Sequence, residues 1–567
     1  MFEKKITAII VSVIASLNLF LYVSMRSVLG FLGYFLHFPF ATYLLGAILA
    51  AMVVVSFINL LHKNNKIRLI VLAILDILFF TLVLGWFIGN IDNYRVFLVE
   101  MVKLLIVYAA VAIIVYLIFY FHKSKIYTKT VATIVCIVLI LGIIIGFTDI
   151  SSLKINYMST GAAVYAVEDE YQIVWATSNK ALGWVEIDGT KYYDELAGSI
   201  RSTDTVHKVV VPQKALDNAK RYTVYSKTMI NEESYSALLG RTFSKTYLFR
   251  PVDTTDGIQY YAVSDTHGNN KKAFSTTDYY GDATDFVILG GDTVSYLSSK
   301  YDLERIVKLA HGVSGGNIPV IYARGNHEVK GVGAESLYKY VGANKSNGYY
   351  FSFKLGSVWG IVLDMGENHE DEWKENFGTA NFDGYRNAQI ELLDEIIDNK
   401  TNSYQAEDVT HKIAISHINT SFTSDSNLFM YDYLIELNQR LNQIDLDVMV
   451  SGHLHQVFLA PKGAPVGSEL KLSTVYKGSD KENSESEYIA TGAMYDTIIC
   501  SRRSNTQVLS TEERTLGKRS IGAALQYKID NQGDGVLEVR FTTDAKKIIN
   551  TVNPFTGESY GSTIYLY

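Results

Sequence analysis

Residues 258–267 read IQYYAVSDTH, in which the apolar run at 258–263 leads directly into a segment with an aspartate and a histidine. Asp265 and His267 stand two positions apart, and side chains two apart point to the same side of an extended chain. Four further apolar runs, at 286–289, 318–322, 412–415 and 446–450, also lead into polar residues. Short apolar runs of this kind predict buried strands. The polar residues that follow them are Asp292, Asn326 with His327 and Glu328, His417, and His453 with His455.

Helical segments at 302–309 and 387–397 and another apolar run at 358–363 lie between these predicted strands. Strands that alternate with helices predict a layered α/β domain, which we place at residues 253–567. The carboxyl ends of such strands meet at one crevice, so the polar residues there are expected to come together. The tail predicts further strands at 488–491, 497–500, 523–529 and 535–541, which are expected to complete the second sheet of this domain.

The residue types at these strand ends suit metal chemistry. Five of the 12 histidines in the chain fall at these few positions. Carboxylate, imidazole and amide ligands suit borderline divalent metals such as manganese, iron or zinc. The only cysteines are Cys136 and Cys500, which excludes a thiolate metal site. The pattern therefore predicts a site for divalent metal whose identity stays open.

The order D-x-H, G-D, G-N-H-E, H and G-H-x-H over residues 258–460 resembles the calcineurin-like metallophosphoesterase superfamily. The resemblance implies a four-layer catalytic domain with two mixed β-sheets and a centre of two divalent metal ions. The ligands that it implies are Asp265, His267 and His455 for one metal, Asn326, His417 and His453 for the second, and Asp292 as a bridge between them. It also implies that His327 is an acid beside the phosphate, oriented by Glu328.

A centre of this kind implies hydrolysis of a phosphate ester by a hydroxide that bridges the two metals. A histidine in the place of His327 would protonate the leaving group. Arg324 is a candidate clamp for a phosphate oxygen, or else one partner of a surface ion pair at the strand end. The acidic loop with Glu367 and His369 is interpreted as solvated rather than as an extra cation site. Whether the substrate is a monoester or a diester stays open.

Residues 151–252 show a different pattern. Alternating runs at 172–177, 183–187, 207–211, 221–226 and 246–249 are separated by turn residues, and no helical period interrupts them. They predict an antiparallel β-sandwich of the fibronectin III or immunoglobulin type. A sandwich before the catalytic domain resembles purple acid phosphatases, as does Tyr385-Arg386 followed by Gln389. This second resemblance does not extend to the metal ligands, because His267 and Ser295 stand where those enzymes have glycine and tyrosine.

The first 150 residues predict an all-α transmembrane domain. Apolar stretches at 6–22, 41–61, 67–89, 96–121 and 131–147 have the length of membrane-crossing helices, so we predict five spans. Lys and Arg gather before the first span and after the second and fourth, which places these connections in the cytoplasm. An odd number of spans then places the catalytic domain outside the cytoplasm. The prediction is a multi-pass protein of the cell membrane, with the lipid bilayer as a partner.

The function predicted from these features is a membrane-anchored phosphoesterase. A net charge of −7 without a basic stripe excludes nucleic acid as a partner, and the sequence names no protein partner. One alternative is a non-catalytic receptor or transporter whose phosphoesterase-like domain binds a ligand. Asp76 and Lys103, within the predicted spans, support that alternative. Another alternative keeps the enzyme but turns its catalytic domain to the cytoplasm.

Overall fold

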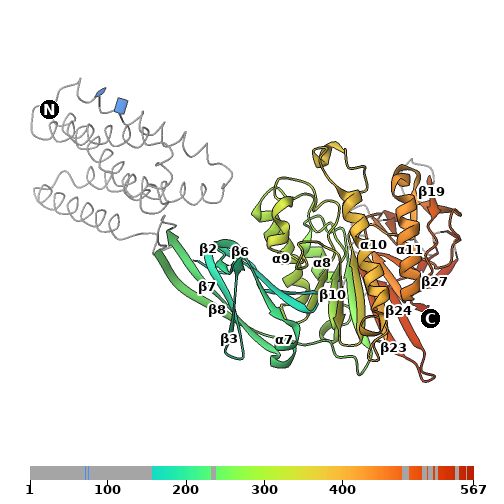
Figure 1. The fold of residues 1–567 in the computed structure, drawn as a ribbon, viewed down its shortest axis with the longest axis horizontal. Helices are drawn as coiled ribbons and strands as arrows, with labels where there is room; N and C mark the ends of the chain where they lie inside the picture. The colour runs from blue at the N-terminus through green and yellow to red at the C-terminus, as the bar shows by residue number, and fades with distance from the viewer. Residues whose placement is uncertain are drawn as a thin grey trace, which may run out of the picture. The chain divides into compact units, whose positions relative to one another are not determined.

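The computed structural model describes residues 70–71, 74–75, 156–231, 238–276, 278–474, 484–500, 507–508, 515–516, 522–542, 548–553, 555–556 and 558–567. One compact unit combines Asn156–Thr228 with Arg241–Tyr567. It is rich in strands (Figure 1). Its residues include all of the strand-end residues singled out above. Two large sheets make up most of the unit, and the carboxyl ends of their strands decide where the polar residues lie.

The first large sheet is built around three parallel strands, β9 (Ile258–Val263), β10 (Phe286–Leu289) and β11 (Pro319–Tyr322). The sequence predicts β9 and β10 at these bounds. The whole sheet has 13 strands, in the order β25-β24-β23-β9-β10-β11-β1-β2-β7-β8, with β28, β3 and β6 attached beside this path. Every residue of β10 and β11 is buried, as expected for parallel strands that are covered on both faces.

Strands from the end of the chain extend this sheet beyond β9. β23 (Gly522–Ile529) pairs antiparallel with β9, and β24 (Gly535–Thr542) pairs antiparallel with β23. β25 (Ile548–Ile549) and β28 (Ile564–Leu566) then pair with β24. The prediction that the tail completes the second sheet is therefore wrong for these strands. Their apolar pattern predicts a strand but does not say which neighbouring edge will bond to it.

The predicted β-sandwich at residues 151–252 is not a separate sandwich. β1 (Ala163–Val167) pairs parallel with β11, and β2 (Glu170–Ile187) pairs antiparallel with β1. Three more strands follow in the same sheet: β6 (Asp204–Pro212), β7 (Arg221–Asn231) and β8 (Leu238–Leu248). This part of the predicted fold class is wrong, because the region continues the catalytic sheet. Alternating apolar runs look the same in a sandwich and in the extension of a mixed sheet.

The second large sheet has eight strands, in the order β12-β13-β14-β16-β20-β17-β21-β22. Four neighbours run parallel: β13 (Val358–Leu363), β14 (His411–Ser416), β16 (Val448–Ser451) and β20 (Asp496–Cys500). The others are β12 (Phe351–Leu355), β17 (Gln456–Ala460), β21 (Gln507–Val508) and β22 (Thr515–Leu516). The sequence predicts β13 at its observed bounds, and the other three parallel strands with small shifts at their ends.

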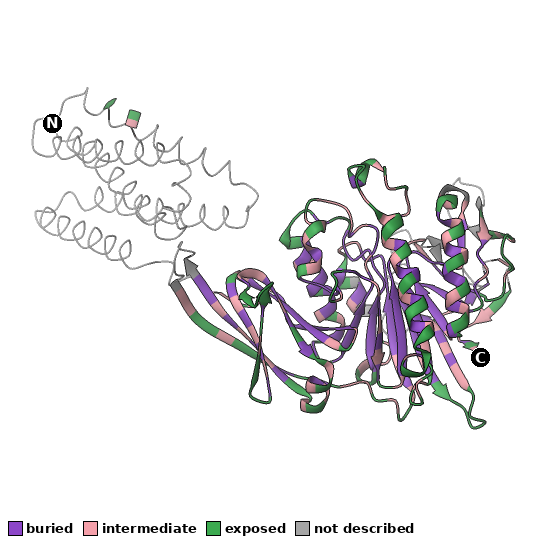
Figure 2. Cartoon of the chain, viewed as in Figure 1, coloured by how far each residue is buried: buried purple, intermediate pink, exposed green. Residues whose placement is uncertain are grey.

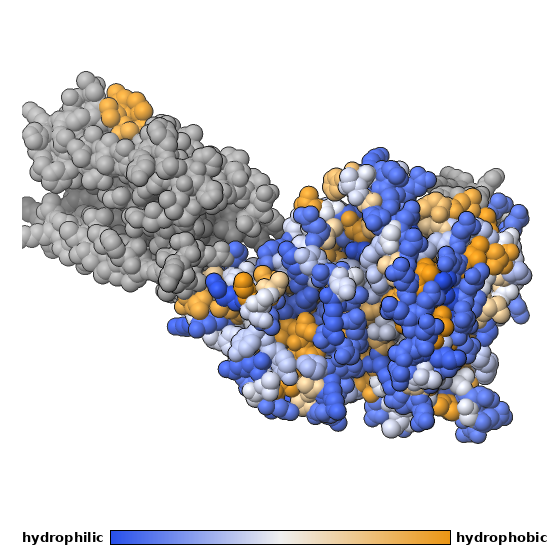
Figure 3. Space-filling model, viewed as in Figure 1, coloured by the Kyte–Doolittle hydropathy of each residue, from blue (hydrophilic) through white to orange (hydrophobic). Residues whose placement is uncertain are grey.

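The two sheets pack face to face, since side chains of β9, β11, β14 and β16 share one apolar core. The other face of the second sheet is covered by α10 (Phe382–Asp398) and α11 (Tyr431–Ile444), which share a second core with β13. α9 (Lys300–Ser314) lies against the first sheet, and α8 (Asn270–Thr276) packs on α9. Figure 2 shows buried strands between helices with exposed outer sides, and Figure 3 shows that these outer sides are mostly hydrophilic.

Smaller elements complete the unit. A short helix, α7 (Gln213–Ala219), lies in the region where the sequence predicts only strands. The small three-stranded sheet contains β15 (Phe422–Ser424), β19 (Ser484–Ala490) and β18 (Glu469–Thr474). The remaining short strands are β3 (Thr190–Tyr193), the pair β4 (Glu195–Leu196) and β5 (Ile200–Arg201), and the pair β26 (Thr551–Val552) and β27 (Ser559–Gly561).

The structure also corrects the all-α transmembrane part of the predicted fold class, which the described residues do not support. Among the described residues, no helix has both the length and the apolar character needed to cross a membrane. The stretches predicted as spans, at 6–22, 41–61, 67–89, 96–121 and 131–147, lie outside the described residues except at 70–71 and 74–75. The prediction rested on the length of apolar runs alone. What the structure describes is a β-rich, layered fold with few helices.

Asp285 stands directly before β10 and is buried, with 7% of its surface exposed. Its carboxylate accepts a hydrogen bond from the backbone N–H of Gln259 on β9 (2.8 Å). Burial raises the pKa of Asp285 from 3.8 to about 6, although the N–H of Gln259 and the charge of Arg250 oppose the rise. Because the pKa in the folded protein lies above the unfolded value, ionisation of Asp285 lowers stability as the pH rises through this range.

We predict that Asp285→Asn stabilises the protein at pH 7.5, since the amide keeps an acceptor for Gln259 and carries no charge. A pKa difference of about two corresponds to a gain of roughly 3 kcal/mol at most. The gain should shrink as the pH falls below about 6 and vanish below about 4, where the carboxyl is protonated in both states. Denaturant unfolding of the wild type and the variant across this pH range measures the gain in stability. A gain that is equal at all pH values contradicts a raised pKa of Asp285.

Candidate metal centre

The polar residues predicted at strand ends lie at the carboxyl edges of the two large sheets. The first sheet contributes Asp265 and His267 after β9, Asp292 after β10, and Asn326 after β11. The second sheet contributes His417 after β14, and His453 and His455 after β16. Parallel strands in both sheets therefore bring residues that are far apart in the sequence to one region of the molecule.

The backbone at these positions has an uncommon conformation. Five of the candidate ligands have a positive φ: Asp265 (55°), His267 (42°), Asp292 (50°), His453 (69°) and His455 (53°). Residues other than glycine rarely adopt this left-handed conformation, which costs about 1–2 kcal/mol each. Strain that gathers at one place in this way is typical of functional sites.

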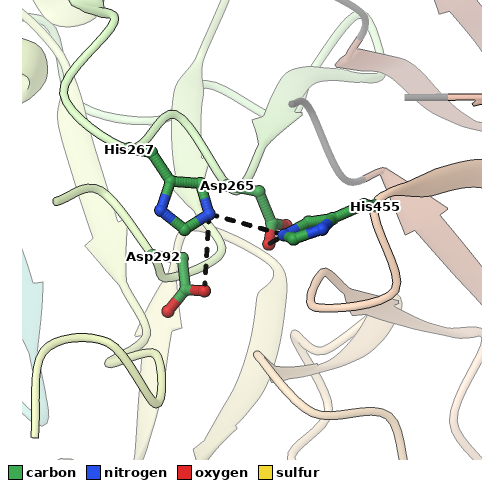
Figure 4. A group of neighbouring side chains, drawn as sticks. All are labelled: Asp265, His267, Asp292 and His455. Atoms are coloured by element: carbon green, nitrogen blue, oxygen red, sulfur yellow. Dashed lines mark hydrogen bonds and ion pairs between the residues drawn. The ribbon is translucent and has the colours of Figure 1, made fainter. Parts of the chain in front are cut away.

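Four side chains form a compact cluster: Asp265, His267, Asp292 and His455 (Figure 4). One ligand atom of each lies within 4.8 Å of the others. His455 Nε2 is 3.2 Å from Asp265 Oδ1 and 3.4 Å from His267 Nε2. His267 Nε2 is 3.7 Å from Asp292 Oδ2. Two carboxylates and two imidazoles that face one another at these distances fit a single divalent cation.

Hydrogen bonds hold one oxygen of Asp265 and leave the other facing the cluster. Oδ2 accepts a hydrogen bond from the hydroxyl of Ser264 (2.7 Å) and another from the backbone N–H of His453 (3.0 Å). Oδ1 is buried and has no well-oriented hydrogen-bond donor. A buried carboxylate oxygen without a donor is costly unless a cation binds it, so Oδ1 fits the role of a metal ligand.

A second group consists of Asn326, His417 and His453. The Nδ1–H of His417 donates to the carbonyl of Gly290 (2.7 Å), which turns Nε2 toward Asp292 Oδ2 at 3.3 Å. Nε2 of His417 is buried and makes no well-oriented hydrogen bond. Asn326 Oδ1 lies 3.2 Å from Nδ1 of His453. The group offers two ring nitrogens and an amide oxygen, a donor set that also suits a divalent metal.

Asp292 connects the two groups. Its Oδ2 faces His267 of the first group at 3.7 Å and His417 of the second at 3.3 Å. Its Oδ1 accepts a hydrogen bond from the backbone N–H of His327 (2.9 Å). Only 1% of Asp292 is exposed, so its charge is kept from water. This position fits a carboxylate that two metals share.

The charges of the cluster also suit metal binding. Burial lowers the pKa of His267 and of His453 to about 4, so both imidazoles are neutral at neutral pH. Burial opposes protonation of His417 too, but the carboxylates of Asp292 and Asp265 outweigh it and raise the pKa of His417 to about 10. These carboxylates have pKa values below the usual range despite their burial, because the histidines stabilise their charge. Ionised carboxylates and neutral imidazoles are the forms that bind metals, so His417 would release its Nε2 proton when a cation binds.

His327 lies beside this cluster. Its Nδ1–H donates to the carbonyl of Ser295 (2.6 Å), and its Nε2 is 3.8 Å from Asp292 Oδ2. The His327 and His267 rings meet edge to face, with centroids 4.8 Å apart. The ring is therefore oriented by Ser295, and its second nitrogen points toward the candidate ligands.

Glu328 makes contacts that the sequence did not predict. It is fully buried and accepts five hydrogen bonds, from the backbone N–H groups of Gly325, Asp292, Thr293 and Val294 and from the hydroxyl of Thr293. All five donors belong to the loops after β10 and β11, and the expectation that Glu328 orients His327 stays a prediction. Glu328 fixes these loops to each other and so places Asp292.

Arg324 contacts a carboxylate and two aromatic rings of the protein. Its Nε lies 2.8 Å from Oδ2 of Asp364, which is buried. Its guanidinium lies over the rings of Tyr349 and Tyr385, at 4.6 and 5.4 Å from their centroids. These contacts match the ion-pair alternative, in a partly buried rather than a surface form. A phosphate clamp by Arg324 stays a prediction.

Glu367 is the residue that the sequence analysis missed. It is fully buried, and its Oε1 accepts a hydrogen bond from Nδ2 of Asn326 (3.0 Å). The interpretation of its loop as solvated is wrong for Glu367, although Glu370 is exposed. His369 stacks on Trp373, with centroids 4.2 Å apart. The signal was present in the sequence, since Glu367 follows the end of β13 as the ligands follow other strands.

The fold and the site together define a class of protein: a layered α/β protein with buried carboxylates and imidazoles arranged to hold divalent cations. Residues 258–457 match the calcineurin-like phosphoesterase family, and this stretch includes every candidate ligand. This part of the chain is a calcineurin-like phosphoesterase domain, and the protein is a metal-dependent phosphoric ester hydrolase. No curated protein matches the chain.

Several solved structures are similar to the fold at low sequence identity. A purple acid phosphatase from yellow lupin (Lupinus luteus) seeds is 12% identical over 71% of this chain and 73% of that chain, with a TM-score of 0.38. PhoD is 11% identical over 71% of this chain and 95% of its own, with a TM-score of 0.36. The phosphopantetheinyl hydrolase of Mycobacterium tuberculosis is 13% identical over 44% of this chain and 90% of its own, with a TM-score of 0.25. Similarity at this level says nothing about the substrate of this chain.

We predict that Glu328→Ala lowers the free energy of unfolding by more than about 3 kcal/mol, because buried donors lose their acceptor. Glu328→Gln keeps one acceptor oxygen and should lose less. Both variants should also bind less metal, since the loop that carries Asp292 is released. Thermal unfolding and bound-metal analysis measure these effects. An alanine variant with unchanged stability and reduced activity would instead support the role beside His327 that the sequence predicts.

Proposed function

We propose that this protein hydrolyses a phosphate ester with a pair of divalent metal ions. One ion would be held by Asp265, His267 and His455, the other by Asn326, His417 and His453, and both by Asp292. The observation that carries the proposal is the position of Asp292, whose buried Oδ2 faces a histidine of each group at 3.3 and 3.7 Å. The donors are nitrogen and oxygen atoms, which suit manganese, iron or zinc.

When bound, two such cations lower the pKa of a water molecule and neutralise charge on the phosphoryl oxygens. The chain itself sets the geometry. Asp265 Oδ1 is directed at the site because Ser264 and the N–H of His453 hold Oδ2. His417 Nε2 is directed at it because the carbonyl of Gly290 holds Nδ1. The ligands are therefore in place before a substrate arrives, which limits the reorganisation that the reaction requires.

His327 is the group that we assign to the leaving oxygen. The carbonyl of Ser295 can only accept, so Nδ1 of His327 carries a proton and Nε2 faces the cluster. A second proton on Nε2 can pass to the leaving-group oxygen as the P–O bond breaks. Nε2 is 3.8 Å from Asp292 Oδ2, so the ring lies beside the candidate ligands.

Two finer predictions belong to this proposal. The substrate is a phosphomonoester or a phosphodiester, and paired assays with an aryl monoester and an aryl diester distinguish them. The position of the catalytic domain outside the cytoplasm, and the lipid bilayer as a partner, rest on the sequence of residues 1–150 and stay predictions.

We predict that chelation of metal abolishes hydrolysis of an aryl phosphate by the full chain, and that added Mn²⁺ or Zn²⁺ restores it. Asp292→Asn should abolish turnover and reduce bound metal, because a neutral amide cannot balance two cations. Its circular dichroism spectrum should match that of the wild type. Activity that survives both chelation and Asp292→Asn contradicts a metal-dependent reaction at this site.

We predict that His327→Ala lowers kcat by about 100-fold to 10,000-fold, since a positioned acid is lost. The loss should be smaller for substrates with good leaving groups, which need less protonation. Bound metal should stay at the wild-type level, because His327 is not a ligand in the proposal. His369→Ala is the matched control, and it should keep the wild-type rate. An equal loss for good and poor leaving groups would remove the acid role from His327.

A further inference from the structure

Glu367 is a buried carboxylate that lies next to the second group of candidate ligands. It follows β13 on the second sheet, and none of its surface is exposed. Its Oε1 accepts hydrogen bonds from Nδ2 of Asn326 (3.0 Å) and from the backbone N–H of Asn368 (2.9 Å). Its Oε2 lies 3.0 Å from Nζ of Lys330. Each carboxylate oxygen of Glu367 thus faces a different set of donors.

The contact matters because a side-chain amide can point in two ways. Only the oxygen of Asn326 can bind a metal, and exchange of its oxygen and nitrogen would place N–H groups toward the cation. An ionised carboxylate accepts hydrogen bonds and donates none. Glu367 therefore selects the orientation in which Asn326 Nδ2 points to Glu367 and Oδ1 points to His453, 3.2 Å away.

The segment that carries Glu367 is itself fixed by α10. Gln389 accepts a hydrogen bond from the N–H of Asp364 (2.9 Å) and donates one to its carbonyl (2.6 Å). Nη1 of Arg386 donates to the carbonyl of Met365 (3.0 Å). Both side chains are buried. The position of Glu367 is thus set by the helix and by the lysine, independently of the candidate ligands.

We propose that Glu367 is a positioning residue for the second metal, which sets the amide orientation of Asn326 while Lys330 neutralises its charge. This inference rests on the proposed two-metal function and adds a residue that acts through a ligand. Lys330 also lies 3.0 Å from Glu375, so its charge is shared with a partly exposed carboxylate. The lysine stabilises the buried charge, whereas the glutamate selects the ligand atom.

Glu367→Gln tests the proposal because it changes almost no volume. An amide has one acceptor oxygen, and Lys330 then competes for it with Asn326 and the backbone N–H of Asn368. The hydrogen bond from a charged donor is roughly twice as strong as a neutral one, so the oxygen turns to Lys330. The new N–H groups then face Asn326, whose oxygen turns to them and away from the metal. The affinity for the second metal should fall by about 10-fold to 100-fold.

Two further variants separate positioning from stability. Lys330→Met leaves Glu367 as an acceptor for Asn326, so it should lower the melting temperature and keep both metals. The double variant Glu367→Gln with Lys330→Met frees the glutamine oxygen for Asn326 and should regain the second metal. It has no charge at either position, so it should fold even if Glu367→Gln alone is unstable. Glu370→Gln, the same change at an exposed position of the same loop, is the control.

The measurement is titration of the metal-free full chain with Mn²⁺ alone, followed by electron paramagnetic resonance. Wild type, Lys330→Met, the double variant and Glu370→Gln should show a coupled pair of Mn²⁺ ions, and Glu367→Gln a single ion at the same concentration. A coupled pair in Glu367→Gln at wild-type affinity overturns the inference, and so does a double variant that holds one ion. A wild type that binds only one Mn²⁺ ion would instead overturn the proposed two-metal function.

Discussion

Three carboxylates buried side by side are the constraint on which the site depends. Asp265, Asp292 and Glu328 are at most 1% exposed, and a buried charge is costly unless donors or cations face it. Glu328 meets this demand with backbone and hydroxyl donors, and its pKa is raised by burial and by the nearby charge of Asp292. Asp265 and Asp292 meet it only in part, with histidines and, for Asp265, the hydroxyl of Ser264. The negative charge that these groups leave unbalanced makes the cluster a site for cations.

The glycines of the motifs are required because the backbone passes very close to these buried carboxylates and their partners. A side chain at Gly325 would place its Cβ 2.2 Å from Asp292 Oδ1, and one at Gly452 would place it 1.9 Å from the hydroxyl of Ser264. The backbone must pass that close so that Gly325 can donate to Glu328 and so that the N–H of His453 can reach Asp265. The glycine in G-N-H-E and in G-H-x-H is thus required by the hydrogen bonds of the carboxylates.

The sequence predicts the strands and the residues at their ends well, because apolar runs that end in polar residues are a local signal. β9, β10 and β13 have the predicted bounds. The pairing of strands is not local, so the sequence did not show that β1 and β2 join the catalytic sheet or that β23 joins β9. The contacts of Glu328 and the burial of Glu367 were missed for the same reason. Each depends on a neighbour that is distant in the chain.

Metal geometry also demands that the two sheets keep a fixed relative position, since ligands come from both. A polar contact between the sheets supplies part of this constraint. Tyr260 on β9 bonds through its hydroxyl to Nε2 of His411 on β14 (2.8 Å), and Nδ1 of His411 bonds to Asp447 (2.7 Å). β9 leads to Asp265 and β14 leads to His417, so the same two strands carry the contact and the ligands. Unlike apolar packing, these directional hydrogen bonds favour one alignment of the sheets. The precision of the site therefore depends on buried polar contacts between the strands that carry the ligands.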